Sequence, residues 1–278
     1  MSSDGPVAAS APIRQTKGGG TGHLTWGSSH ILANVLVALD AEEREARKLA
    51  APQEVAAGTQ RLPDGAAAGR SAGKAPKRPQ RCVLELGAGT GQLAVTLARA
   101  GWRGIWATDG EPAVVRNMKY NVQANRLGHA VRCMKWDWQD SPPSSLELAD
   151  VDLVIGADLV YYNRAHGMLS SVLRSILTAR PPSDPRPPVR ALLLCCLRQA
   201  YDDGAGQVEH HPSSEGYAGT SMQRFIEREL PSQSLVARQL PLPADAFPPS
   251  GDASEKGTPS SMGPRSAYQL YEVAVKVA

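Results

Sequence analysis

A glycine-rich turn between a short apolar run and a helical pattern constrains this chain more than any other feature. Residues 83–92 read Val-Leu-Glu-Leu-Gly-Ala-Gly-Thr-Gly-Gln, and Asp109 follows the next apolar run, residues 104–108. A strand, a glycine turn and a carboxylate after the second strand form a nucleoside site at the edge of a parallel sheet. The glycines let the backbone approach the ligand, and the carboxylate accepts hydrogen bonds from ribose hydroxyls.

The spacing of the turn indicates which nucleoside binds. A dinucleotide fingerprint reads G-x-G-x-x-G/A, whereas this turn reads G-x-G-x-G, with Gln92 where the third small residue should stand. Glu85 adds a second carboxylate, which would repel a pyrophosphate but suits the positively charged methionine end of S-adenosylmethionine. The pattern resembles the S-adenosylmethionine-dependent methyltransferases, and Gln92 argues against a nicotinamide oxidoreductase.

Composition limits the class of protein. The 278 residues are 42% hydrophobic and 21% charged, which suits one large α/β domain. The net charge of +3 comes from scattered Lys and Arg, so it does not predict nucleic-acid binding. We expect no secretory signal, because residues 1–20 lack an apolar segment, and no membrane span. The four cysteines lack zinc-ligand spacing, so we predict no metal site and an intracellular protein with reduced thiols.

Alternating strand and helix patterns fill most of the chain. This alternation predicts a doubly wound, mostly parallel sheet with helices on both faces. Apolar runs and helical spacing place strands at 82–86, 105–108, 131–136, 151–157, 189–197 and 268–277, and helices at 31–49, 92–100, 112–125, 165–179 and 221–230. The mixed alternation of residues 268–277 indicates an outer or antiparallel strand.

Segments rich in Gly, Pro, Ala and Ser interrupt this pattern. They cannot bury enough apolar surface to offset chain entropy. We predict a disordered tail at 1–20 and one domain over 21–278, with flexible inserts at 50–80, 181–188, 202–220 and 241–264.

The carboxyl ends of the parallel strands select the candidate ligand residues, because ligands of such sheets bind there. The residues that follow strands two, three and four should face one crevice: Asp109, Asp137, Trp138, Asp158, Tyr161 and Tyr162. We expect Trp138 to stack on or enclose an adenine ring. Trp136 lies in its strand and points to the opposite face, so we expect it in the core.

The turn after the fourth strand bears on the substrate. Enzymes that methylate the amino groups of adenine, cytosine or glutamine usually carry an Asn/Asp-Pro-Pro-Tyr turn there, but this chain has Asp158-Leu159-Val160-Tyr161 and no proline. Residues 21–33, with Trp26 before an apolar helix, resemble the leader of one group that carries D-x-x-Y. The chain is similar to the family 16 methyltransferase-like seven-strand enzymes, most of which methylate protein lysines.

That resemblance implies roles for particular residues. It places Trp26, Gly87, Ala88, Gly89, Asp109, Trp138 and Ala157 on the cofactor, which is S-adenosylmethionine, and Asp158 and Tyr161 on the catalytic motif; Glu85 joins the cofactor set from the motif above. Asn117, Asn121 and Asn125 match an Asn-containing helix, where we expect polar surface. Arg198 either contacts substrate or forms a structural ion pair, and the histidines receive no role.

The predicted reaction is methyl transfer to a lysine of a protein substrate, with translation factors and chaperones as the kinds known for the family. We expect a monomer in the cytoplasm, and the basic stretch 74–78 also allows the nucleus. Two alternatives stay open. One is a methyltransferase of the same fold that acts on a small molecule or nucleic acid, and the other is a non-catalytic S-adenosylmethionine-binding scaffold.

Overall fold

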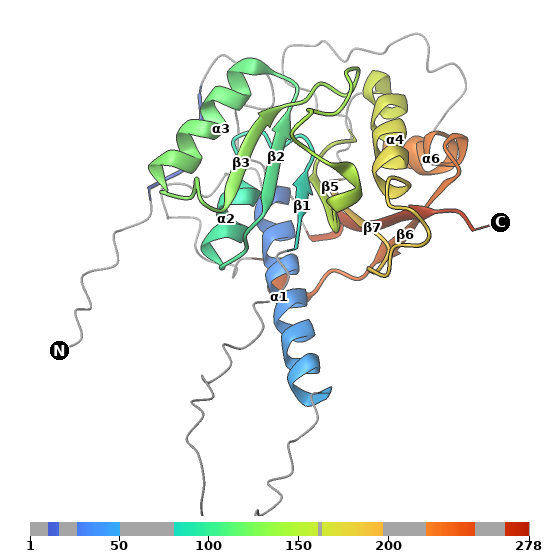
Figure 1. Cartoon of the computed structure of the whole chain (residues 1–278), viewed down its shortest axis with the longest axis horizontal. Coiled ribbons are helices and arrows are strands. Elements are labelled where there is room, and N and C mark those ends of the chain that lie inside the picture. Colours follow the sequence, from blue (N-terminus) through green and yellow to red (C-terminus); the bar gives the residue numbers. More distant parts are fainter. Residues whose placement is uncertain are drawn as a thin grey trace, which may run out of the picture.

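Seven strands form one mixed sheet in the order β3-β2-β1-β4-β5-β7-β6 (Figure 1). The computed structural model of the chain describes residues 11–16, 27–50, 81–160, 163–196, 221–247 and 265–277. The strands span Val83–Glu85 (β1), Ile105–Asp109 (β2), Val131–Lys135 (β3), Leu153–Ala157 (β4), Arg190–Cys196 (β5), Leu235–Leu240 (β6) and Tyr268–Val275 (β7). The predicted doubly wound, mostly parallel seven-stranded sheet is confirmed.

The order of the strands reverses beside β1. β1 pairs in parallel with both β2 and β4, so the chain moves from one side of β1 to the other between β3 and β4. β7 runs antiparallel between β5 and β6, which confirms the predicted antiparallel last strand. In an open α/β sheet the crevice at such a reversal lies outside the carboxyl ends of the strands. Glu85, Asp109 and Ala157 end their strands at this edge.

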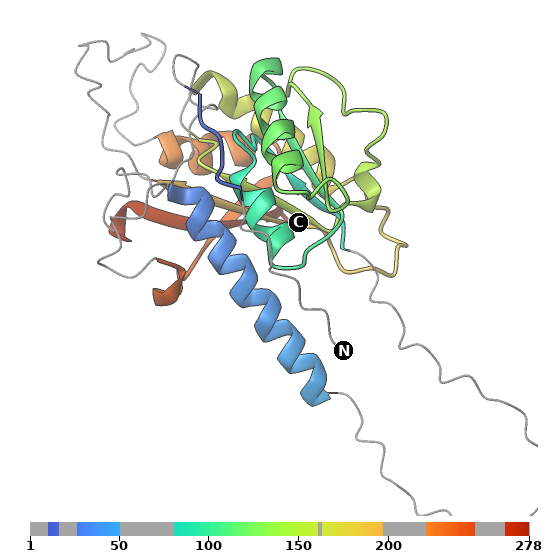
Figure 2. The ribbon, with the colours of Figure 1, turned by 90° about the vertical axis from the view of Figure 1, so that its left-hand side faces the viewer.

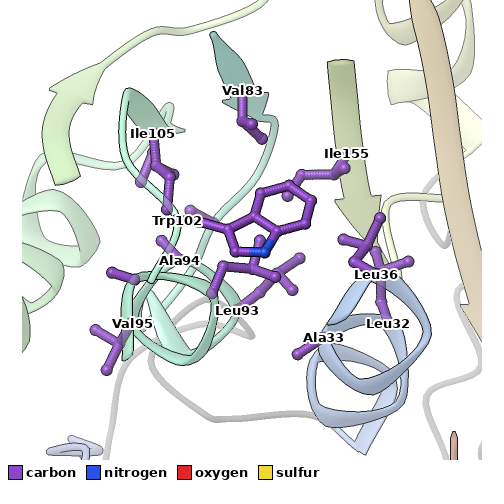
Figure 3. Packing of buried hydrophobic residues seen from close by; sticks show 14 of the residues in the cluster. Leu32, Ala33, Leu36, Val83, Leu93, Ala94, Val95, Trp102, Ile105 and Ile155 are labelled. Carbon is purple, nitrogen blue, oxygen red and sulfur yellow. The ribbon is translucent and has the colours of Figure 1, made fainter. Parts of the chain in front are cut away.

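Helices cover both faces of the sheet. One face packs against α1 (Gly27–Ala50), α2 (Gln92–Arg99) and α3 (Pro112–Ala124), and the other against α4 (Asn163–Leu177) and a segment made of α5 (Ser221–Arg224), the π-type turn η4 (Phe225–Glu229) and α6 (Leu230–Ser232). Short 3-10 turns lie at Leu148–Asp150, Ala244–Ala246 and Arg265–Ala267. Figure 3 shows Trp102 between α1, α2 and the strands, in one buried cluster with Leu93 and Leu36.

Local sequence explains where α2 and α3 begin. Gly91, at φ 79°, turns the chain into α2, a backbone conformation that glycine adopts without strain. Glu111 caps α3 by accepting a hydrogen bond from the Ala113 amide, and Pro112 occupies the first turn, where its missing N–H costs nothing. The length of α1 carries its carboxyl-terminal half beyond the sheet in both views (Figures 1 and 2).

Two segments that we predicted as flexible inserts are partly built into the fold. Within 181–188, Arg186 pairs with Asp184 at 2.7 Å and donates to the Ala149 carbonyl. Within 241–264, residues 241–247 are described: Asn34 of α1 donates to the Ala246 carbonyl, and Ala246 is buried. Hydrogen bonds between a side chain and a distant main-chain carbonyl hold both stretches, from Arg186 to Ala149 in one and from Asn34 to Ala246 in the other. The other predicted inserts, 50–80 and 202–220, lie outside the described residues.

Part of the predicted disordered tail is also ordered. Residues 11–16 lie against α3, where Arg14 bonds with the side chains of Asn117 and Asn121. Both asparagines are buried, so the expectation of polar surface for them was wrong. The reason is that an amide side chain can replace solvent with main-chain partners, which a helical pattern alone does not reveal.

The edge strand β6 has no counterpart among the strands we predicted. Its residues alternate poorly, since one end is buried at Leu235 while Val236, Arg238 and Gln239 are exposed. Among the described helices, none is long and apolar enough to cross a membrane.

Candidate active site

The glycine turn leaves the carboxyl end of β1 through left-handed backbone. Gly87 and Gly89 have φ values of 57° and 55°. A Cβ atom at Gly87 would lie only 2.6 Å from the Leu159 side chain, so no larger residue fits without displacing it. The Ala88 amide donates to the Thr108 carbonyl at 2.8 Å, and the Gly91 amide donates to the Ala88 carbonyl at 2.8 Å. These bonds tie the turn to β2 and hold it open toward the crevice.

Glu85 is a buried carboxyl group beneath the turn. Glu85 is 2% exposed, and its Oε2 atom has no hydrogen-bond partner in the part of the chain that the structure describes. Burial raises the pKa of Glu85 to about 8, while a hydrogen bond from the Ala94 amide lowers it and the charge of Asp109 raises it further. A cation that approaches this carboxyl group favours its ionised form, and the resulting carboxylate then pairs with the cation.

Asp109 ends β2 beside the glycine turn. Its Oδ2 atom accepts a hydrogen bond from the Gly89 amide at 3.0 Å, and its Oδ1 atom accepts from the Glu111 amide at 3.1 Å. Two amides thus fix the orientation of the carboxylate. A carboxylate held at this edge of the sheet is the kind of group that accepts hydrogen bonds from ribose hydroxyls.

These residues fit S-adenosylmethionine. The turn offers glycine backbone for close approach, Asp109 offers a fixed carboxylate for the ribose, and the unpaired Oε2 atom of Glu85 lies buried next to both. The strongest support for this fit is the unpaired Oε2 atom of Glu85. A buried polar atom without a hydrogen-bond partner destabilises the fold, so it usually serves a ligand or another function.

The predicted burial of Trp136 is confirmed, but its predicted place in the strand on the opposite face is wrong, because β3 ends at Lys135 and Trp136 and Trp138 pack in the same hydrophobic cluster. Trp136 is 3% exposed and packs in the core beside α4, with its indole nitrogen donating to the Asp140 carbonyl at 3.3 Å. Trp138 is half-buried and lies 3.8 Å from the Cβ position of Gly87, next to the glycine turn. Its place suits a wall for an adenine ring, and its cofactor role stays a prediction. Asp137 caps its own loop by accepting from the Gln139 amide.

Asp158 occupies an unusual position after β4. Its φ of 57° is left-handed, which few residues other than glycine adopt, with Asn and Asp the commonest exceptions. The Ser28 hydroxyl donates to Oδ2 at 2.7 Å, and the Cys196 amide donates to Oδ1 at 2.7 Å. The carboxylate therefore joins the start of α1 and the end of β5 to the turn after β4. Nothing in the residue pattern pointed to Ser28 beyond its place in the leader.

The structure describes two of the remaining predicted site residues, Ala88 and Ala157. Ala88 is buried in the glycine turn and Ala157 is partly buried at the end of β4. Trp26, Tyr161, Tyr162 and Arg198 lie outside the described residues. The residue that sequence reasoning most clearly missed is Asn121, whose side chain donates to the Thr90 carbonyl of the glycine turn at 2.9 Å. The spacing of four between the asparagines of α3 was the available signal.

Known methyltransferases resemble parts of this chain. The ribosomal protein L11 methyltransferase of Bradyrhizobium diazoefficiens is 37% identical over 75 residues, so the chain spans about a quarter of the length of the curated relative it matches. Among solved structures, the CcbJ methyltransferase from Streptomyces caelestis has a TM-score of 0.47 at 14% identity, over 71% of this chain and 84% of that one. The glycopeptide N-methyltransferase MtfA, in complex with S-adenosylmethionine, has a TM-score of 0.44 at 14% identity, over 72% and 84% of the two chains.

A family model gives the broader match. The model described as lysine methyltransferase matches residues 9–182, which is more than half of the chain and includes the glycine turn, Asp109 and Asp158. The match confirms the family, the S-adenosylmethionine cofactor and the class of S-adenosylmethionine-dependent methyltransferase that the sequence predicted. This chain belongs to the lysine methyltransferase family.

Proposed function

We propose that this protein transfers methyl groups from S-adenosylmethionine to a lysine side chain of a protein substrate. The observation that carries the proposal is the position of Asp158, whose carboxylate is fixed at the carboxyl end of β4, next to the strand that bears the cofactor turn. The family description supports lysine as the acceptor.

Different residues of the site are proposed to bind the cofactor and the substrate. When bound, S-adenosylmethionine supplies an electrophilic methyl group on a sulfonium. The glycine turn, Glu85 and Asp109 hold it at the ends of β1 and β2. We assign the ribose to Asp109 and the substrate to Asp158, which follows the neighbouring strand β4.

A lysine must lose its proton before it can attack, because an ammonium has no lone pair. Its ordinary pKa of about 10.4 falls on desolvation and beside a positive sulfonium. We infer that Asp158 receives the incoming ammonium and aligns its nitrogen. The bonds from Ser28 and Cys196 hold this carboxylate in a fixed orientation. We assign the orientation of the deprotonated amine to Tyr161, the role that the family resemblance implies for it.

The proposal is tested by finding the methylated atom. The protein is incubated with S-adenosylmethionine labelled on its methyl group and with a cell lysate, and labelled products are digested and sequenced by mass spectrometry. Label on lysine Nζ of one or a few proteins is the expected result. Label on a small molecule, on nucleic acid, or on arginine or glutamine would reject the substrate class. Cofactor binding without any label transfer would favour the scaffold instead.

A further inference from the structure

Residues 11–16 run beside α3 (Figures 1 and 2), where Arg14 bonds with Asn121. One side chain of α3, that of Asn121, contacts both this segment and the turn. Asn121 bonds with Arg14 on one side and with Thr90 on the other. One turn of the helix earlier, Met118 packs against Gly91, where an added Cβ would lie 2.9 Å from its Cγ. α3 is therefore the physical link between the amino-terminal segment and the cofactor turn.

The amide of Asn121 is satisfied only when both neighbours are present. Its Oδ1 atom accepts from the Arg14 main-chain amide at 2.8 Å. Its Nδ2 atom donates to the Arg14 carbonyl at 3.1 Å and to the Thr90 carbonyl at 2.9 Å. The residue is 0% exposed, so water cannot replace a lost partner at low cost. If the segment leaves, the amide is free to rotate away from Thr90 in search of other partners.

The side chain of Arg14 fastens the segment from outside. Its Nε atom donates to the Asn117 Oδ1 at 2.8 Å, and its guanidinium lies 4.2 Å from the centre of the Tyr120 ring. The Asn117 Nδ2 atom donates to the Arg14 carbonyl at 3.0 Å. Further along, Arg99 donates to the Ala11 carbonyl at 3.0 Å. Arg14 is itself exposed, so Arg14→Ala removes its Nε bond and its contact with the Tyr120 ring without opening a cavity in the core, while the main-chain bonds of residue 14 to Asn117 and Asn121 remain possible.

We propose that Arg14 is a positioning residue for the cofactor, acting through Asn121 on the Thr90 carbonyl of the glycine turn. With residues 11–16 in place, the turn keeps the backbone that S-adenosylmethionine meets. Without them, the turn samples other arrangements and only a fraction of molecules is competent to bind. This inference rests on the cofactor site and is independent of the substrate that receives the methyl group.

The test measures cofactor affinity in a double-mutant cycle on the full chain. Arg14→Ala, Asn121→Ala and the double variant are titrated with S-adenosylhomocysteine and with S-adenosylmethionine by calorimetry. Arg116→Ala is the matched control, because Arg116 is an exposed arginine on the same helix. Arg14→Lys keeps a cation near Tyr120 but lacks the planar donor, so it should recover part of the loss. Thermal melting of each cofactor-free protein and hydrogen exchange of peptides covering 87–95 complete the set.

Arg14→Ala should raise the Kd for both ligands roughly fivefold, the effect of about one net hydrogen bond. Asn121→Ala should raise it by at least as much, and the double variant should lose no more than Asn121→Ala alone, since the two act in series. Exchange should quicken in 87–95 but not in β5 or β7. An unchanged Kd in Arg14→Ala, or additive losses in the double variant, would overturn the inference. If the parent protein binds neither ligand, the cofactor assignment fails instead. If Asn121→Ala does not fold, the Kd of Arg14→Ala compared with that of Arg116→Ala still tests the inference.

Discussion

The carboxylate of Asp158 joins the first turn of α1 to the end of β5, with Ser28 on one oxygen and the Cys196 amide on the other. The two bonds are equally short, at 2.7 Å, and they hold a residue whose backbone is left-handed. Asp158 therefore has a structural task in addition to the substrate role proposed for it. The two tasks predict different outcomes for different substitutions.

Asp158→Asn separates the two roles. Asn tolerates left-handed backbone nearly as well as Asp, and its amide oxygen can still accept from Cys196, so the local structure should survive. If the negative charge receives the lysine, methyl transfer should fall by roughly a hundredfold, in the range of losing a group that acts in the transition state. The Kd for S-adenosylmethionine should change little. Transfer is measured with labelled cofactor, and affinity by calorimetry.

Two further variants complete the comparison. Asp158→Ala should lose transfer and also stability, because Ser28 and Cys196 both lose their acceptor. Ser28→Ala removes one bond but keeps the charge, so it should lower transfer far less than Asp158→Asn. Full activity in Asp158→Asn would leave Asp158 with the structural task alone.

Asp109→Ala should weaken the cofactor. Each hydrogen bond from a ribose hydroxyl to this carboxylate is worth roughly 1.5–3 kcal/mol, since bonds to charged groups are the stronger class. The Kd for S-adenosylhomocysteine should therefore rise at least tenfold in a calorimetric titration. NAD binding in the parent protein, without S-adenosylmethionine binding, would contradict the assignment.

The sequence predicted the elements whose pattern reflects local chemistry. The glycine turn, the buried run of β4 and the Glu111-Pro112 start of α3 all follow from residue types at fixed spacing. β6 could not be predicted from its own residue pattern, because its strand conformation depends on pairing with β7. Arg238 lies directly opposite Glu272 of β7 and pairs with it at 2.6 Å, a contact between segments 34 positions apart.

The candidate site divides in the same manner. Glu85, the glycines and Asp109 are recognisable because each follows a predicted strand, whereas Ser28 and Asn121 act through partners 130 and 31 positions away. A polar residue on a predicted helix looks like surface until the segment that covers it is known. Residues 11–16 carry too little apolar character to predict that they cover anything.

His166 should make stability depend on acid pH. The residue is 0% exposed, and neither ring nitrogen has a hydrogen-bond partner among the described residues. Burial, and secondarily the charge of Arg224, lower the pKa of His166 to about 4 from 6.5. Between these values the unfolded chain binds more protons than the folded one, so this contribution to stability is full above pH 6.5 and declines as the pH falls toward 4.

Comparison of variants isolates that contribution. His166→Phe keeps a ring against Phe225, which it meets edge-on at 5.5 Å, but cannot be protonated. The Tm of the parent minus that of His166→Phe should fall between pH 6.5 and pH 4.5 and stay constant above it. His129→Gln, at an exposed histidine, should leave the profile of the parent unchanged. A constant difference for His166→Phe across the whole range would show that the buried ring does not titrate there.

Glu85 should couple cofactor binding to the release of a proton. With a pKa of about 8, the buried carboxyl is mostly neutral at pH 7 in the cofactor-free protein. A sulfonium nearby favours the charged carboxylate and lowers that pKa, so binding S-adenosylmethionine expels a proton. The affinity should therefore rise as the pH increases toward 8, and level off above it, where Glu85 is already ionised. The same raised pKa works against the folded state, which loses stability as the pH rises from about 4.5 to 8.

Calorimetry in two buffers counts the proton directly. The observed binding enthalpy at pH 7 should differ between phosphate and Tris by the difference in their ionisation enthalpies, multiplied by the fraction of a proton released. Glu85→Gln is the matched variant, because the amide has the same shape, can accept from Ala94 and stays neutral. Binding of S-adenosylmethionine to Glu85→Gln should release no proton from residue 85, and the affinity of this variant should not rise toward pH 8. S-adenosylhomocysteine, which lacks the sulfonium charge, should release less of a proton from the parent. Equal proton release from the parent and from Glu85→Gln would place the titrating group elsewhere and leave Glu85 with a packing role under the glycine turn.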